Sequence, residues 1–179
     1  AAQEPLSESM VRSVLGWEEA QAKRVLIVDC DVHQGDGTAT ILADVDAAIT
    51  VSLHCENNFP ARKAQSDWDI PLPRGLDDAG YLHTLEQVLN YLLPIYQPDL
   101  VLYDAGVDVH QLDALGHLQL TDAGIAARDR LVIDSCLGRD IPVCAVIGGG
   151  YDRDRDALAR RHGILHHSAA AIWQQRGLG

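Results

Sequence analysis

The chain has 179 residues and a mass of 19.5 kDa, which is enough for one sizeable domain and short for two. Hydrophobic residues make up 47% of it and charged residues 22%, a balance typical of a folded domain and not of a disordered chain. A formal net charge of −12 argues against a direct nucleic-acid partner. No apolar run approaches the roughly 20 residues that cross a bilayer, which argues against a membrane protein.

Strands and helices are predicted to alternate from the first residues onward. Near-continuous apolar runs, typical of strands buried on both faces, predict strands over 24–29, 48–54, 100–106 and 143–149. Apolar residues at helical spacing, with capping residues at several ends, predict helices over about 9–22, 78–97, 122–137 and about 154–173. This alternation predicts an α/β fold of three layers, αβα, with a mainly parallel sheet.

The stretch over 55–77 interrupts this alternation. It is rich in proline, charge and polar residues and is predicted to be a long, irregular loop of the active site, because long loops in compact domains are usually functional. No linker or internal repeat divides the chain, so 1–179 is predicted to be one domain.

The cysteines and the amino-terminal residues bear on the compartment. The four cysteines form no C-x-x-C pair, and a domain of this size needs no disulfides. The first ten residues, AAQEPLSESM, have neither the basic region nor the apolar core of a signal peptide. These features predict a reducing, cytoplasmic location.

Each predicted strand is followed by polar or reactive side chains. In open parallel sheets, ligands bind beyond the carboxyl ends of the strands, so these side chains are expected to meet at one edge. In chain order they are Asp29, Asp31, His33 and Asp36, then Ser52 and His54, then Asp104 and Asp108, then Tyr151.

Asp31 and His33 stand two residues apart, so in an extended segment both side chains leave the same face and can hold one ion. Asp108 would complete an Asp–His–Asp set, and three protein ligands leave a position open, as in catalytic zinc sites. Turns and helix caps use the same residue types, so the motif alone leaves both interpretations open.

Phosphate chemistry is a rival explanation of the two aspartates that end the first strand. Aspartyl-phosphate enzymes need a lysine near the end of a later strand. Neither of the two lysines, Lys23 and Lys63, lies at such a position. The sequence also lacks a G-x-x-x-x-G-K-[ST] phosphate loop and the spacing of the dinucleotide fingerprint. Phosphate chemistry is therefore disfavoured.

Four segments together resemble the histone deacetylase family, of the arginase/deacetylase fold, in the right order and over about residues 20 to 170. They read VLIVDCDVHQGDGTA, VSLHCENNFP, LVLYDAGVDVHQLDALGHLQLT and IPVCAVIGGGYD. The forms DVHQGDGTA and NFPARK are most similar to the bacterial and class IV branch. The resemblance implies a zinc-dependent amidohydrolase that removes acyl groups from lysine side chains or related amines.

The resemblance also implies roles for particular residues. One zinc ion per chain, which activates the attacking water, would be held by Asp31, His33 and Asp108. The hydroxyl of Tyr151 would polarise the scissile carbonyl and stabilise the oxyanion. The acyl-lysine tunnel would be lined by Phe59, Leu115, Gly149 and Gly150.

Potassium is a second ion that the resemblance implies. One site would use Asp29, Ser52 and the carbonyl of Leu53, together with the backbone of Asp31 and His33. A second would use the backbone carbonyls of Leu42, Val45 and Ala48.

The histidine pair that the family carries in a G-x-HH-A segment is missing from its expected place. Only 28 residues precede Asp29, and none of them is a histidine. Asp29 and Asp36 match the carboxylates that orient this pair. We therefore expect the C-terminal portion of a deacetylase domain, without its N-terminal strands.

Two alternatives remain beside the enzyme. The first is a catalytically weak or inactive module that binds metal or acyl-lysine without a general base. The second is a binuclear, arginase-like hydrolase, which is disfavoured because Gly35 stands where a further metal-binding Asp would be needed. The sequence does not indicate an oligomeric state.

Overall fold

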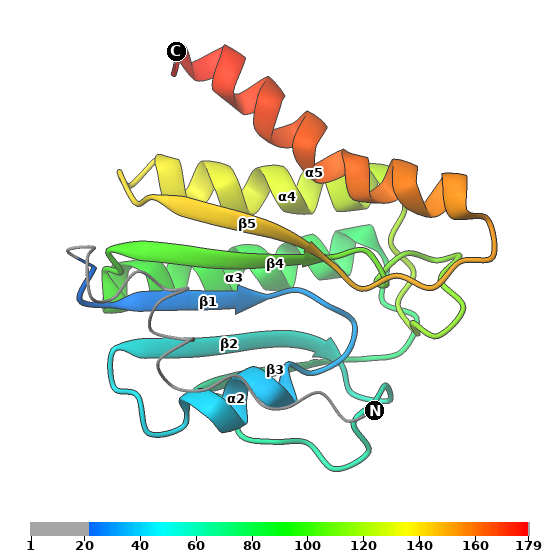
Figure 1. The fold of residues 1–179 in the computed structure, drawn as a ribbon, viewed down its shortest axis with the longest axis horizontal. Helices are drawn as coiled ribbons and strands as arrows, with labels where there is room; N and C mark the ends of the chain where they lie inside the picture. Colours follow the sequence, from blue (N-terminus) through cyan, green and yellow to red (C-terminus); the bar gives the residue numbers. More distant parts are fainter. Residues whose placement is uncertain (1–21, 179) are drawn as a thin grey trace.

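The computed structural model describes residues 22–178 and contains one five-stranded sheet (Figure 1). All four strand pairs are parallel, in the spatial order β3-β2-β1-β4-β5. Asp29 at the end of β1 lies in register with Ser52 on one side and Asp104 on the other. The strands are β1 Val25–Asp29, β2 Ala48–Cys55, β3 Trp68–Leu72, β4 Leu100–Gly106 and β5 Val143–Gly148.

Four helices connect or follow these strands, and three begin at a side-chain cap of the expected kind. Asp77, Thr121 and Asp154 each accept a hydrogen bond from a backbone N–H in the first turn, which satisfies donors that the helix leaves free. The helices are α2 Asp36–Leu42, α3 Asp78–Tyr96, α4 Asp122–Leu137 and α5 Arg155–Arg176. None of them is both long and apolar enough to cross a membrane.

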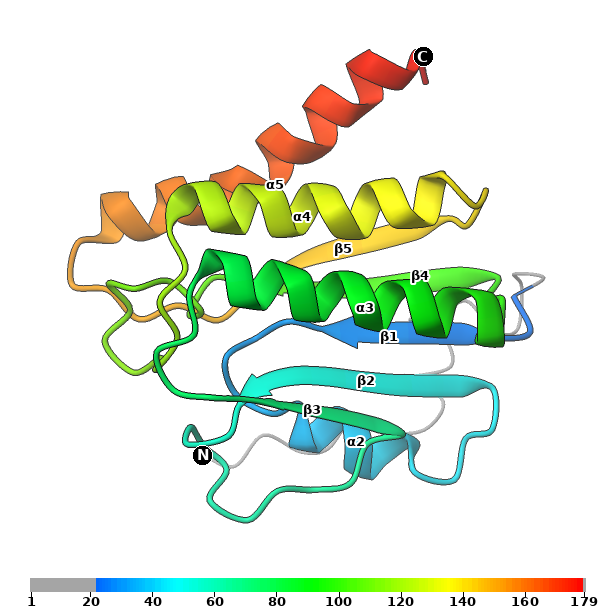
Figure 2. The same cartoon turned by 180° about the vertical axis from the view of Figure 1, so that it is seen from behind.

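The helices lie on both sides of the sheet, as the sequence predicts. Seen from behind, α3 and α4 run side by side across one face (Figure 2). The short α2 lies against β2 on the opposite face, and α5 packs on α4 near β5 (Figures 1 and 2). The three-layer αβα arrangement with a parallel sheet is therefore confirmed.

The main hydrophobic core lies between the sheet and the helix pair α3 and α4. Alternate side chains of the central strands point into it, because successive residues of a strand face opposite sides. The fully or almost fully buried members include Leu26, Val28, Val51, Leu53, Val101 and Tyr103 from the sheet, Tyr81, Leu85 and Leu89 from α3, and Ile125, Val132 and Cys136 from α4.

The segment 55–77, predicted to be a loop throughout, contains the edge strand β3, so this prediction was wrong for Trp68–Leu72. Trp68 packs edge-on against Tyr91 with ring centroids 5.7 Å apart, and its Nε1 donates to the Tyr96 hydroxyl over 2.8 Å. Pro71 is compatible with a strand here because an edge strand pairs on one side only.

Two further differences concern helices. The short helix α2 was not predicted, since its sequence DGTATIL carries only two buried residues, Ala39 and Leu42. The helix predicted over about 9–22 lies outside the described residues, apart from its last position. The other predicted strands and helices are present within a few residues of their predicted bounds.

Candidate metal centre

The carboxyl ends of β1 and β4 bring three predicted ligands together. Asp31 and His33 follow β1, and Asp108 follows the neighbouring β4, so the parallel pairing places them at one edge of the sheet. One potential ligand atom from each residue lies within 4.8 Å of the other two. The convergence predicted for these three side chains is therefore present.

The imidazole of His33 stands between the two carboxylates. Its Nδ1 lies 3.0 Å from Asp31 Oδ1 and 3.1 Å from Asp108 Oδ2. The carboxylates are held in turn by backbone donors: Val32 N–H donates to Asp108 Oδ1 and His33 N–H donates to Asp31 Oδ1, each over 2.8 Å. Asp108 is fully buried, whereas Asp31 and His33 keep some exposure to solvent.

The pKa shifts reflect a partly buried cluster in which two carboxylates stabilise the protonated imidazole between them. Hydrogen bonds to Asp108 and Asp31 raise the pKa of His33 to about 10. Burial raises the pKa of Asp108 to about 6. Burial would also raise the pKa of Asp31, but hydrogen bonds with His33 and Asp108 keep it below its ordinary value. One imidazole and two carboxylates are a donor set that suits zinc.

Zinc binding to this cluster is expected to strengthen as pH rises. Without metal, the His33 imidazole is protonated below its pKa of about 10, so at neutral pH an incoming ion must displace that proton. The affinity should therefore increase by up to about tenfold per pH unit between about pH 7 and 9. Competition titrations against a chelating dye across this range measure it, and an affinity independent of pH would contradict the assignment of His33.

The glycine loop after β5 closes over the cluster. Gly149 has a φ of +56°, and a Cβ built on it would lie 2.5 Å from Asp108 Oδ2 and 2.5 Å from Asp31 Oδ2. Only glycine fits there without displacing both carboxylates. Gly150 also has a positive φ, of +104°, but a Cβ built on it would meet Leu158 and Val107, so of the two predicted tunnel glycines it is Gly149 that lies against the predicted ligands.

Replacing Gly149 by Ala is expected to weaken metal binding. The left-handed backbone alone should cost about 1–2 kcal/mol of stability with an alanine there. The added methyl group would also collide with the carboxylates of Asp108 and Asp31 and push them out of their present positions. The matched control is Gly37→Ala in α2, where a Cβ meets nothing within 4 Å. Zinc titrations of both variants check this, and parental affinity in Gly149→Ala would refute the close approach.

Tyr151 is held by its backbone while its side chain is exposed. Its N–H donates to Asp113 Oδ2 over 2.6 Å, and its carbonyl accepts from Ala114 N–H over 2.9 Å. Asp113 Oδ1 also accepts from the N–H groups of Leu115 and Gly116. One carboxylate thus joins the loop of Tyr151 to the loop that carries Leu115, a role that sequence reasoning missed.

The two predicted tunnel walls lie on loops that a buried amide connects. Asn58 Nδ2 donates to the carbonyl of Leu115 over 2.8 Å, and Asn58 Oδ1 accepts from His117 N–H over 3.0 Å. Phe59 and Leu115 themselves are 69% and 50% exposed, so both present apolar surface to solvent. Asn58 was also missed, although an asparagine beside a predicted tunnel residue is a weak signal for such a bridge.

The residues predicted for the first potassium site also lie close together. Asp29 and Ser52 are register partners on adjacent strands and both are buried, as is Leu53. Asp29 Oδ1 accepts from Asp31 N–H over 2.9 Å. Burial and the nearby Asp104 carboxylate raise the pKa of Asp29 well above its usual range.

The remaining predicted positions are placed as follows. Asp36 lies in the first turn of α2. Leu42 ends α2, Val45 lies in the turn that follows, and Ala48 begins β2. The carbonyls of Leu42 and Val45 already accept from the N–H groups of Val45 and Ala48.

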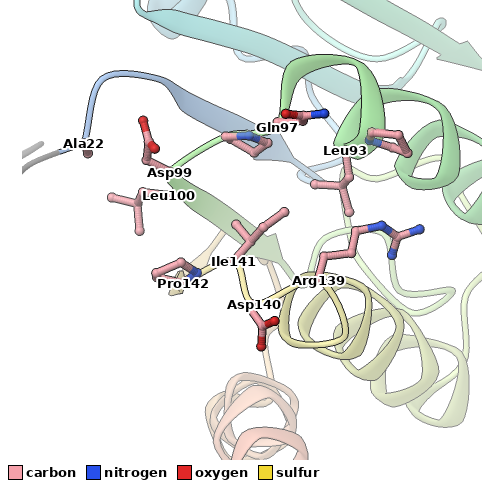
Figure 3. Close-up of a pocket in the computed structure, with 11 residues that line it drawn as sticks. Ala22, Leu93, Gln97, Asp99, Leu100, Arg139, Asp140, Ile141 and Pro142 are labelled. Carbon is pink, nitrogen blue, oxygen red and sulfur yellow. The ribbon is translucent and has the colours of Figure 1, made fainter.

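A pocket lies at the opposite end of the sheet, where β4 and β5 begin (Figure 3). Its lining includes Asp99, Arg139 and Asp140, none of which is among the predicted site residues. The three predicted zinc ligands therefore lie at the carboxyl edge of the sheet and not in this pocket.

Solved structures share this architecture. The HDA15 HD domain superposes with a TM-score of 0.70 and 26% identity, over 90% of this chain and 48% of that one. The histone deacetylase Clr3 gives a TM-score of 0.72 and 26% identity, over 89% of this chain and 29% of that one. The fold is therefore the three-layer arginase/deacetylase fold.

Sequence comparison identifies the family within this fold. The model of the histone deacetylase domain matches residues 11–166. Histone deacetylase 2 of Arabidopsis thaliana is 33% identical over 132 residues, which are 72% of this chain and 34% of that protein. An uncharacterized protein of Picosynechococcus is 52% identical over 152 residues, 85% of this chain and 51% of that protein. The chain belongs to the histone deacetylase family, and it spans about half or less of the length of these relatives.

Proposed function

We propose that this chain carries the metal centre of a zinc-dependent deacylase that acts on acylated lysine or a related acylated amine. The observation that carries the proposal is the cluster of Asp31, His33 and Asp108, in which one ligand atom from each residue lies within 4.8 Å of the others. Membership of the histone deacetylase family supports it.

The ligand set suits one zinc ion per chain. When bound, zinc would polarise the scissile amide carbonyl and lower the pKa of a water molecule toward about 7. The protein's part is to hold two carboxylates and one neutral imidazole at a partly open position. Val32 N–H and His33 N–H keep the carboxylates oriented for this task.

Tyr151 is proposed to donate its hydroxyl to the oxygen on which negative charge develops. The backbone of this residue is fixed on both sides, by Asp113 and by Ala114, while the side chain remains free to meet substrate. A neutral phenol suits this role because it donates a hydrogen bond without first having to gain a proton. Phe59 and Leu115 are proposed to flank the acyl-lysine chain.

The general base is the part of the mechanism that this sequence does not supply in the usual position. His33 is the first histidine of the chain, and it is a proposed ligand. His166 and His167 lie exposed on α5, far along the chain from the predicted position. Loss of a general base typically costs about 10²–10⁴ in rate.

A second candidate function, carried by the same cluster, is a module that binds zinc and acyl-lysine but turns it over weakly or not at all. Asp29 and Asp36, which the family resemblance pairs with two histidines, would then have no imidazole to orient. Residues outside this chain would have to supply the base for full activity.

Two further proposals concern ions and compartment. Asp29, Ser52 and Leu53 are proposed to hold a structural potassium ion with the backbone of Asp31 and His33, because buried carboxylate, hydroxyl and carbonyl oxygens suit a hard cation. All four cysteines of the chain are free thiols in the structure, which supports a reducing compartment such as the cytoplasm.

The two functions are separated by one experiment on the complete protein that contains this chain. An acetyl-lysine peptide is incubated with it, with and without a chelator, and the free-lysine peptide is quantified by mass spectrometry while peptide binding is followed by fluorescence anisotropy. Chelator-sensitive hydrolysis supports the enzyme. Metal-dependent binding without hydrolysis supports the module, and neither binding nor hydrolysis would refute both.

A further inference from the structure

Arg128 on α4 is a fully buried charged side chain that the proposed mechanism does not use. Burying a guanidinium is costly unless its donors are satisfied, and a buried ion pair alone rarely adds stability over apolar packing. An arginine at this position of the core therefore calls for an explanation.

Its donors reach the ends of the two strands that carry the proposed zinc ligands. Nη1 donates to the carbonyl of Gly106 over 2.6 Å and to that of Cys30 over 3.3 Å, while Nη2 donates to the carbonyl of Ala105 over 3.2 Å. Cys30 directly precedes the ligand Asp31, and Gly106 stands two residues before the ligand Asp108.

These strand ends are packed very closely. A Cβ added to Gly106 would lie 2.6 Å from Asp31 Cα, so the backbones of β4 and of the segment after β1 nearly touch. The N–H of Cys30 donates to the carbonyl of Asp104 over 3.0 Å, and the carbonyl of Cys30 accepts from Arg128, so this residue is bonded to both β4 and α4. The guanidinium thus joins both backbones immediately before they diverge toward the ligands.

The guanidinium is itself fixed by its neighbours. Asp129 Oδ1 accepts from Arg128 Nε and Nη2, each over 3.0 Å, and also from the Tyr103 hydroxyl over 2.6 Å. The Arg128 Cζ lies 5.9 Å from the centroid of the Tyr103 ring. A planar fork with five donors can make all of these bonds at once, whereas a lysine ammonium has three donors on a single nitrogen.

We infer that Arg128 is a positioning residue of the metal centre: by bonding to the carbonyls of Cys30, Ala105 and Gly106, it sets the separation of Asp31 and Asp108. This inference rests on the proposed metal site. Arg128 thus connects helix α4, which covers one face of the sheet, to the backbone segments that lead to the proposed ligands. Outer partners of this kind typically change metal affinity by about 10–100-fold.

The test uses Co²⁺ as a spectroscopic probe in the complete protein that contains this chain. Parent, Arg128→Lys and Val132→Ala are titrated with Co²⁺ well below their unfolding temperatures, and the visible absorption spectrum and Kd are recorded. Val132 is fully buried on the same helix, so its truncation destabilises the same packing without removing a bond to the strand ends.

Arg128→Lys should show an altered Co²⁺ spectrum and a Kd raised by about 10-fold or more, while Val132→Ala should keep the parental spectrum and Kd. A parental spectrum and Kd in Arg128→Lys would overturn the inference, and so would an equal change in Val132→Ala. No Co²⁺ binding by the parent would instead refute the proposed metal centre.

If Arg128→Lys does not fold, Asp129→Asn decides the question. This variant keeps the guanidinium but removes the charge that aligns it. An altered Co²⁺ spectrum and a raised Kd in Asp129→Asn support the inference, and parental values overturn it.

Discussion

Replacing Asp108 by Asn is expected to abolish zinc binding and acyl-lysine hydrolysis together. Asp108 is the fully buried member of the cluster, and its loss leaves two of the three proposed ligands, Asp31 and His33. The zinc affinity should fall by more than the roughly 100-fold that loss of an outer-shell partner costs. Amide and carboxylate have nearly the same shape, so the variant changes charge and ligand strength with little change in packing. Metal content by mass spectrometry and the peptide assay measure the two effects.

The control for this variant is Asp44→Asn. Asp44 is an exposed carboxylate in the turn after α2, and its replacement removes the same charge from the protein without touching the cluster. It should leave metal content and rate at the parental values. If Asp108→Asn kept both its zinc and its rate, Asp108 would not be a ligand.

Replacing Tyr151 by Phe is expected to reduce kcat while leaving zinc bound. The variant removes one hydroxyl, so the rate should fall by about 10²–10³, the usual effect of losing one oxyanion donor. KM should change little, because the aromatic ring itself is retained. The backbone bonds to Asp113 and Ala114 do not depend on the hydroxyl, so the loop should keep its position.

Tyr91→Phe is the matched control for this second variant. Tyr91 is an exposed tyrosine on α3, 57% accessible to solvent, and it packs against Trp68 at β3. Its replacement should leave kcat unchanged. An unchanged kcat in Tyr151→Phe would remove this residue from the mechanism, whereas loss of zinc would mean that its role is structural.

The central part of the fold was predictable because buried parallel strands have a strong sequence signal. Runs such as RVLIVD and LVLYDAG are apolar on both faces, and the helices between them carry regular spacing and caps. β3 was not predicted, since WDIPL is short and lies among prolines and a glycine that favour a loop. Its stability comes from tertiary packing of Trp68 and Ile70 against α3, and no local pattern encodes that.

The candidate site was also predictable in part. Asp31, His33 and Asp108 could be brought together from sequence, because strand ends of a parallel sheet share one edge. Arg128 and Asn58 could not, since most of their partners are backbone groups far along the chain: 98 residues separate Arg128 from Cys30. Backbone acceptors exist at every residue, so such bonds leave no side-chain pattern to detect. The role of Tyr151 stays a prediction.

The most direct test of a single-zinc deacylase is a zinc titration of the chelator-treated complete protein with hydrolysis of an acetyl-lysine peptide as the readout. We expect the rate to be lost on chelation and to return in proportion to added zinc, with saturation at one ion per chain. A rate that persists without metal, or that requires two ions per chain, would contradict the account.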